Sequence, residues 1–286
     1  MVRYCGRDFS PEELQTIARI LSQDPHRTRA SLSRLICEAL DWRKPDGGLK
    51  EMSCRVALLR MASDGLLTLP PPRRLPQKCR PLPITAATDP QAPITAQAGA
   101  LDDLRLEVVT HPDQSALWRE YIQRYHYLGY SPLPGAQLRY MALSGGQVLA
   151  LLGFGAAAWK TAPRDRFIGW NDRQRQERLP LIVNNARFLI LPWVNSKNLA
   201  SKLLAMVAKR LPQDWTTRYG YRPVLLETFV ESPRFRGTCY KAANWIYVGQ
   251  TKGRGKLDVH NTASLPQKAI WLYPLTPAFR QTLCAP

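Results

Sequence analysis

A proline-rich segment at residues 70–98 constrains this chain more than any other feature of its sequence. Proline fixes φ and lacks a backbone N–H, so such a segment continues neither a helix nor a sheet and is typical of a semi-rigid linker. We therefore expect two domains, residues 1–69 and 99–286, joined by a basic linker over 70–98. The prolines and basic residues that indicate this linker are Pro70, Pro71, Pro72, Pro76, Pro81, Pro83, Pro90, Pro93, Arg73, Arg74, Lys78 and Arg80.

The charge of the chain indicates what it binds. Of its 286 residues, 40 are Lys or Arg and 22 are Asp or Glu, which gives a net charge of +18. After Glu231 the sequence has one acid, Asp258, against eight basic residues, so the excess is strong at the C-terminal end. Such an imbalance says little about fold, but it favours nucleic acid as the partner. We expect DNA, as duplex and as a single-stranded or flipped base.

The cysteines and histidines do not form a metal-binding pattern. The six cysteines are scattered without a CxxC pair, and the four histidines are equally dispersed, so we expect no zinc site. The first residues are charged before any apolar run begins, unlike a signal peptide, and no run has the length of a membrane span. The expected setting is the cytoplasm, with reduced thiols and no membrane contact.

Residues 1–69 predict three helices. A capping box at Ser10–Glu13 begins the first, over 9–23, and the second and third are expected over Thr28–Leu40 and Met52–Ser63. LLTLP follows as a candidate wing strand, so the pattern is typical of a winged helix-turn-helix, with a generic helical bundle as the alternative. On the third helix we expect Val56, Leu58 and Leu59 to face inward and Lys50, Arg55 and Arg60 to face DNA.

Residues 99–286 predict an α/β domain with a mixed sheet. The order is a strand (LRLEVVT), a helix (His111–Tyr127), two strands joined by SGG, a strand (VNNARFLILP) and an amphipathic helix. A strand at 224–230, a short helix at Tyr240–Trp245, a strand to Gln250 and a final strand complete the order. The long helix places Leu199, Leu203, Val207 and Leu211 inward. The fold class is thus α+β, and this order matches the N-acetyltransferase (GNAT) superfamily.

Residues 221–256 contain the most informative polar group. Glu227 lies inside an apolar run that reads as a buried strand, where an isolated charge is costly. It must be paired, hydrogen-bonded, protonated or exposed at a cleft. The loop from Lys252 to Lys256 alternates cations with glycine, which suits close approach to phosphate.

Several motifs resemble the DruA-type proteins. They are NNARFLILPWV, RYGYRPVLLETFVE, RGTCYKAANWIYVGQTKGRGK, YHYLG, PGAQLRY and LLGFGAAAWK, with RTRASLSRLICEALDW and LKEMSCR nearer the N-terminus. This family is named for the Druantia anti-phage defence system, and relatives accompany transposases in mobile elements. The resemblance implies a role in defence or mobile-element biology, with DNA and defence-system proteins as partners. It supplies no established reaction.

Modification of a DNA base is the first functional hypothesis, although the sequence leaves open whether the chain is an enzyme. Glu227 would be the general base, Tyr240 or His126 the proton donor, and Asn184 and Asn185 would present amides to a base edge. The cofactor stays unknown, because the GNAT-like position for coenzyme A reads PWVNSKNLAS and lacks the usual glycines.

Two alternatives remain open. In the first, the chain is a non-catalytic DNA-recognition subunit that recruits a partner and uses Trp245, Tyr247, Trp271 and Tyr273 to stack on bases. In the second, it is a metal-dependent nuclease, which needs clustered carboxylates that the sequence does not bring together. Under every hypothesis, the residues expected to contact DNA in the C-terminal domain are Arg234, Arg236, Lys241, Lys252, Arg254 and Lys256.

Overall fold

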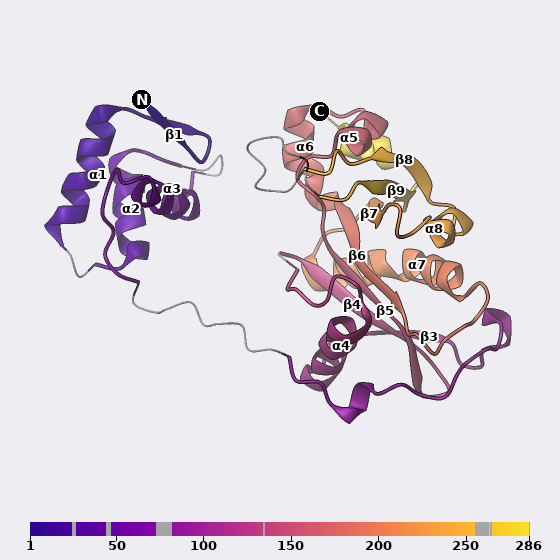
Figure 1. Cartoon of the computed structure of the whole chain (residues 1–286). Coiled ribbons are helices and arrows are strands. Elements are labelled where there is room, and N and C mark those ends of the chain that lie inside the picture. Colours follow the sequence, from indigo (N-terminus) through magenta and orange to yellow (C-terminus); the bar gives the residue numbers. More distant parts are fainter. Residues whose placement is uncertain are drawn as a thin grey trace. The chain divides into compact units, whose positions relative to one another are not determined.

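The computed structural model describes residues 1–24, 27–43, 47–72, 82–133, 135–254, 263 and 265–285. The chain divides into two compact units, Met1–Pro81 and Leu82–Pro286 (Figure 1). Lys256, expected to contact DNA, lies outside the described residues.

The first unit contains a hairpin and three helices. Strands β1 (Val2–Tyr4) and β2 (Arg7–Phe9) pair, and helices α1 (Pro11–Gln23), α2 (Arg29–Ala39) and α3 (Glu51–Ser63) follow. The predicted capping box is present at the start of α1, and Thr28 caps α2. No strand forms among residues 66–72, so the winged helix is not confirmed, and β1–β2 was not predicted.

The face of α3 differs from the prediction. Leu58 is buried as expected, together with Cys54, Ala57 and Met61, but Val56 and Leu59 are 38% and 48% exposed. The buried face of α3 therefore consists largely of small and sulfur-containing residues, which were not predicted to face inward. The apolar side chains of Val56 and Leu59 face solvent instead.

The second unit is built on a seven-stranded sheet of order β3-β4-β5-β6-β7-β9-β8. Adjacent strands of this sheet pair antiparallel, except for β6 and β7, which pair parallel. The sheet is therefore mixed, as the order of the predicted elements implied. The strands are β3 (Arg105–Val108), β4 (Gln137–Ser144), β5 (Gln147–Ala156), β6 (Ile182–Ile190), β7 (Leu225–Glu231), β8 (Ile246–Gln250) and β9 (Lys268–Pro274).

Helices cover both faces of this sheet. Neighbouring residues of β4 point to opposite faces. Arg139 donates to Ser115 of α4 (Pro112–Tyr125), and Tyr140 donates to Asp214 of α7 (Leu199–Tyr219), so these two helices lie on opposite faces. The four apolar residues predicted to face inward from α7 are all buried. A crossover helix of this length is what a parallel pair such as β6–β7 requires.

Shorter elements complete the second unit. Two helices, α5 (Ala162–Ile168) and α6 (Asp172–Arg178), lie between β5 and β6, and α8 (Thr238–Ala242) and α9 (Phe279–Leu283) lie near the C-terminal end. Residues in the second half of the expected linker pack against this unit. Thr85 and Thr88 donate to Glu120 of α4, and Ile94 bridges to Val194.

Candidate functional site

A cleft opens where β6 and β7 separate. The two strands pair only from Ile182–Leu225 to Asn184–Glu227, and beyond these residues they diverge. The cleft has a volume of about 900 Å³, which is the size of a small-molecule or nucleotide site. Its walls are formed by residues 125–128, 131–133, 184–190, 228–231, 235–240, 251, 253, 254, 265, 266 and 268, together with Ala158 and Ala200.

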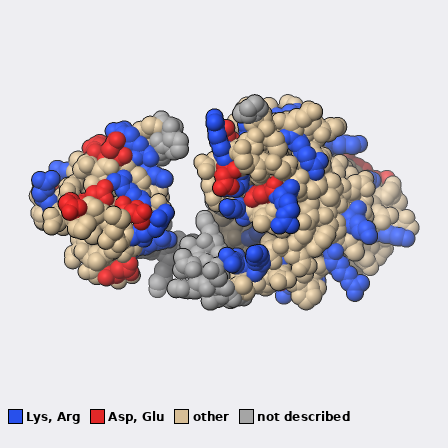
Figure 2. Space-filling model, turned by 90° about the horizontal axis from the view of Figure 1, so that it is seen from above, with Lys and Arg blue, Asp and Glu red and all other residues tan. Residues whose placement is uncertain are grey.

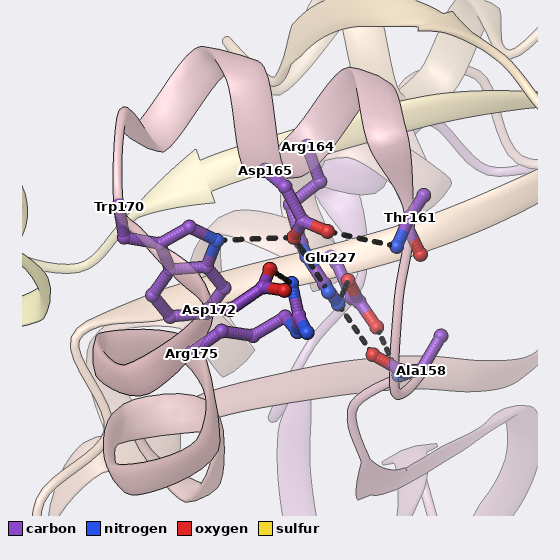
Figure 3. Close-up of polar contacts among 8 residues, drawn as sticks. All are labelled: Ala158, Thr161, Arg164, Asp165, Trp170, Asp172, Arg175 and Glu227. Carbon is purple, nitrogen blue, oxygen red and sulfur yellow. Dashed lines mark hydrogen bonds and ion pairs between the residues drawn. The ribbon is translucent and has the colours of Figure 1, made fainter.

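Glu227 lies outside this cleft, in a fully buried ion pair (Figure 3). Arg164 of α5 donates to Glu227 Oε2 at 2.8 Å, and the Ala158 N–H donates to Oε1 at 2.7 Å. Arg164 also donates to Asp165 and to the Ala158 carbonyl, and its side chain is 0% exposed. Burial raises the pKa of Glu227, while the Arg164 guanidinium and the Ala158 N–H act in the opposite direction. Both of its oxygens therefore accept hydrogen bonds within the protein, and its role as a general base stays a prediction.

Asn185 and Tyr240 do come together. The Tyr240 hydroxyl donates to Asn185 Oδ1 at 2.8 Å, and Asn185 Nδ2 donates to the carbonyls of Gly153 and Arg187. Burial raises the pKa of Tyr240, so its phenol is neutral. The Asn185 amide is thus used on both sides to hold β5, β6 and α8 together, and it has no free edge to offer a base.

Asn184 differs from its neighbour. It lies at the last position at which β6 pairs with β7, and it is one of the residues that line the cleft. The Oδ1 atom is buried and has no hydrogen-bond partner within the described part of the chain. A buried acceptor without a partner is costly, so this position favours a ligand that brings a donor.

The mouth of the cleft carries two aromatic rings from loops far apart in sequence. Tyr127 and Phe235 meet edge to face with centroids 5.2 Å apart, and they are 37% and 47% exposed. The Arg234 guanidinium lies over the Tyr127 ring at 4.9 Å, and the His126 ring stacks with the Tyr127 ring at a centroid distance of 4.9 Å. Exposed rings of this kind offer a stacking surface. Tyr127 and Phe235 were not among the predicted site residues, although Phe235 stands between two arginines.

His126 is a neutral side chain at this mouth. Burial, and secondarily the charge of Arg187, lowers the pKa of His126 from 6.5 to about 4. Its Nδ1 accepts from the Leu128 N–H at 3.2 Å, which leaves the proton on Nε2. A neutral imidazole is a poor proton donor near pH 7, so the geometry favours a hydrogen-bonding role over the predicted catalytic one.

Cations surround the cleft. Arg187, Arg236, Arg254 and Lys268 line it, and Arg187 donates to Ser131 Oγ while its Nε has no partner among the described residues. Arg234 pairs with Glu231 at 3.3 Å, and Lys241 and Lys252 are exposed without lining the cleft. In Figure 2, Lys and Arg side chains are spread over the visible face of the second unit, and fewer Asp and Glu side chains are visible on it.

The aromatic residues proposed for the recognition alternative lie elsewhere. Trp245 and Trp271 are buried, at 4% and 8% exposed, and belong to the core of the second unit. Tyr247 and Tyr273 do not line the cleft. Within the described ranges, no group of three or more His, Cys, Asp and Glu side chains is placed to hold a metal ion, and no helix is long and apolar enough to cross a membrane.

Comparison with known families identifies the chain. The family model described as Druantia protein DruA matches residues 75–282. The chain belongs to the DruA family. The match covers most of the second unit, and residues 1–74 and 283–286 lie outside it, although the motifs that resemble the family extend into the N-terminal domain. A search of curated proteins finds no match.

Solved structures similar to this DruA-family chain include N-acetyltransferases. The polyamine N-acetyltransferase of Drosophila melanogaster shares 11% identity over 59% of this chain and 100% of that one, with a TM-score of 0.38. An N-acetyltransferase from Staphylococcus aureus shares 13% over 61% and 100%, with a TM-score of 0.39. The ribosomal-protein-S18-alanine N-acetyltransferase of Escherichia coli shares 9% over 60% and 95%, with a TM-score of 0.37. These likenesses carry no information about activity.

Coenzyme A, which a GNAT-like fold implies, does not fit the turn before α7. Residues 192–198 contain no glycine, and Asn198 precedes the helix without a side-chain cap. The segment from Ile94 to Ala98 is hydrogen-bonded to this turn. The Asn195 N–H donates to the Ile94 carbonyl, and the N–H groups of Ile94 and Ala98 donate to the carbonyls of Trp193 and Lys197. A pyrophosphate needs free backbone N–H groups at this place, so we derive no step through coenzyme A.

The low pKa of His126 predicts a pH dependence of stability. The unfolded chain binds a proton at His126 below about pH 6.5, whereas the folded chain binds it only below about pH 4. Between these values protonation favours unfolding, so stability falls as pH decreases through this window. Denaturant unfolding across pH 7 to 4 should show a shallower decrease for His126→Gln than for the wild type. Equal slopes for the two proteins would contradict the prediction.

Proposed function

We propose that this DruA-family chain binds DNA and holds one unstacked nucleotide in the cleft between β6 and β7. The observation that carries the proposal is the buried, unpartnered Oδ1 of Asn184 inside a cleft lined by cations. An acceptor at this position suits a base that presents a donor, such as an exocyclic amino group.

The other walls of the cleft fit the remaining parts of a nucleotide. The exposed rings of Tyr127 and Phe235 suit a base face, and stacking of this kind accepts any base. Arg236, Arg254 and Lys268 suit the phosphates on either side, and the net charge of +18 favours a polyanion over a neutral metabolite. DruA membership supports a setting in phage defence, where a partner would act on the DNA that this chain recognises.

The salt dependence of binding tests this proposal. Replacing Arg236, Arg254 and Lys268 by glutamine should reduce the slope of log K against log salt for single-stranded DNA by about 2, because each phosphate contact contributes about 0.7. Fluorescence anisotropy over a salt series measures the slope. The matched control replaces Arg173, Lys209 and Arg222, which are exposed and outside the cleft. Equal losses in the two triple variants would assign the binding to overall charge and remove the cleft from the DNA interface.

Modification of the held base is the second candidate. It is favoured by the polar group at the inner end of the cleft, where Tyr240, Asn185 and Thr228 are linked by hydrogen bonds. Glu231 is the one carboxylate among the described residues of the cleft, and it is paired with Arg234. Because this leaves no free carboxylate as general base there, binding is better supported than reaction. Nucleoside mass analysis of DNA incubated with the protein decides between them, since a changed nucleoside mass would establish an enzyme.

A further inference from the structure

Helix α3 of the first unit presents an apolar stripe to solvent. Met52, Val56 and Leu59 are 65%, 38% and 48% exposed. Their spacing of four and three residues places them on one face of the helix, opposite the buried face. Helix α3 is therefore apolar on two opposite sides, which is typical of a helix that is covered on both.

Two arginines flank this stripe. Arg55 precedes Val56 by one residue and Arg60 follows Leu59 by one, so that at 100° per residue they lie on opposite sides of the stripe. Neither forms an ion pair within the described ranges of the chain, whereas Arg34 of the neighbouring helix is paired with Glu51. A surface with an apolar centre and a basic rim suits a partner with an apolar centre and an acidic rim.

Duplex DNA suits this face less well, although Lys50, Arg55 and Arg60 were predicted to contact it. A recognition helix reads base edges and phosphates mainly with polar side chains, whereas the centre of this face is Met52, Val56 and Leu59. A second copy of the chain suits it less well too. A two-fold contact between copies would bring the same arginines toward one another.

We propose that α3 docks an acidic amphipathic helix of a partner protein. The apolar residues of that helix would pack on Met52, Val56 and Leu59, and its carboxylates would pair with Arg55 and Arg60. This docking surface is independent of the nucleotide cleft, and it assigns the first unit to partner recruitment and the second to DNA.

Designed peptides of defined chemistry test the surface. The probe is a helical peptide with leucines at i, i+4 and i+7 flanked by glutamates, and the controls are the same composition in scrambled order and the same stripe flanked by lysines. Each is titrated into the full chain and followed by fluorescence anisotropy. We expect the striped acidic peptide to bind at least about tenfold more tightly than either control.

Two variants separate the apolar stripe from its rim. Met52→Ser/Val56→Ser/Leu59→Ser should lose this preference while keeping the wild-type circular dichroism spectrum and DNA affinity, since all three side chains are exposed. Arg55→Glu/Arg60→Glu should reverse it, so that the lysine-flanked peptide binds better. Leu66→Ser, a change at a residue equally exposed as Leu59, should alter nothing.

Three results would overturn the proposal. Equal binding of striped and scrambled peptides would reduce the effect to the net charge of the chain. Self-association of the wild type that the serine variant abolishes would assign the stripe to a second copy. If the triple serine variant lost as much DNA affinity as the Arg55→Glu/Arg60→Glu variant, duplex DNA and not a partner helix would be the ligand of α3.

Discussion

Replacing Arg164 by methionine is expected to lower the free energy of unfolding of the second unit by about 3–5 kcal/mol. The guanidinium is 0% exposed and is the counter-charge of Glu227, which is also 0% exposed. Removing one partner of a buried pair leaves the other charged, desolvated and uncompensated, which costs an amount of this order. The measurement is urea unfolding followed by tryptophan fluorescence, compared with the wild type.

A second variant separates the charge from the packing. In Arg164→Met/Glu227→Met both charges are absent, so most of the lost stability should return, because replacing both partners by apolar residues is often close to neutral. The control Arg173→Met breaks an exposed pair with Glu177 and should cost less than about 1 kcal/mol. A double variant as unstable as Arg164→Met would mean that volume and not charge holds α5 on the sheet.

Replacing both Tyr127 and Phe235 by alanine is expected to weaken binding of single-stranded DNA by about 10- to 100-fold. Stacking of a base on an aromatic ring contributes about 1–3 kcal/mol, and these rings are the exposed ones at the cleft mouth. Anisotropy titrations at fixed salt measure the loss. Removal of the Tyr127 ring also frees Arg234, which lies over it, so the double variant has no less positive charge available for phosphates.

The matched control for this prediction is Tyr247→Ala. Tyr247 is 50% exposed and does not line the cleft, so its removal should leave the affinity unchanged. A strand with one abasic site at its centre gives a second control. The wild type should bind it less tightly than the intact strand, and the double variant should bind the two alike. A double variant that retains wild-type affinity would exclude these rings as the stacking surface.

Much of the fold could be predicted from local patterns. The capping box at Ser10 and the helical spacing of Leu199, Leu203, Val207 and Leu211 depend on neighbouring residues alone, and both are present in the structure. The proline-rich segment was harder to interpret. Its second half packs on α4 through Thr85 and Thr88, a contact that needs Glu120 from a distant part of the chain.

The site was less predictable, because its residues meet across large separations in sequence. Glu227 could be recognised as an unusual charge in a strand, but its partner Arg164 lies 63 residues earlier, in a helix for which the sequence analysis made no prediction. Asn184 and Asn185 look alike in sequence, yet the Asn185 amide is hydrogen-bonded, whereas Asn184 Oδ1 has no partner among the described residues. Tyr127 and Phe235 meet only because two loops converge at the separation of β6 and β7.

Photo-crosslinking tests the central claim, that a nucleotide enters this cleft, most directly. A duplex with one unpaired 5-iododeoxyuridine is irradiated in complex with the full chain, and the modified tryptic peptides are mapped by mass spectrometry. The account predicts adducts at the cleft mouth, on Tyr127 or Phe235, that are lost when an excess of unlabelled single strand competes. Adducts confined to the first unit, or to residues outside the cleft, would contradict it.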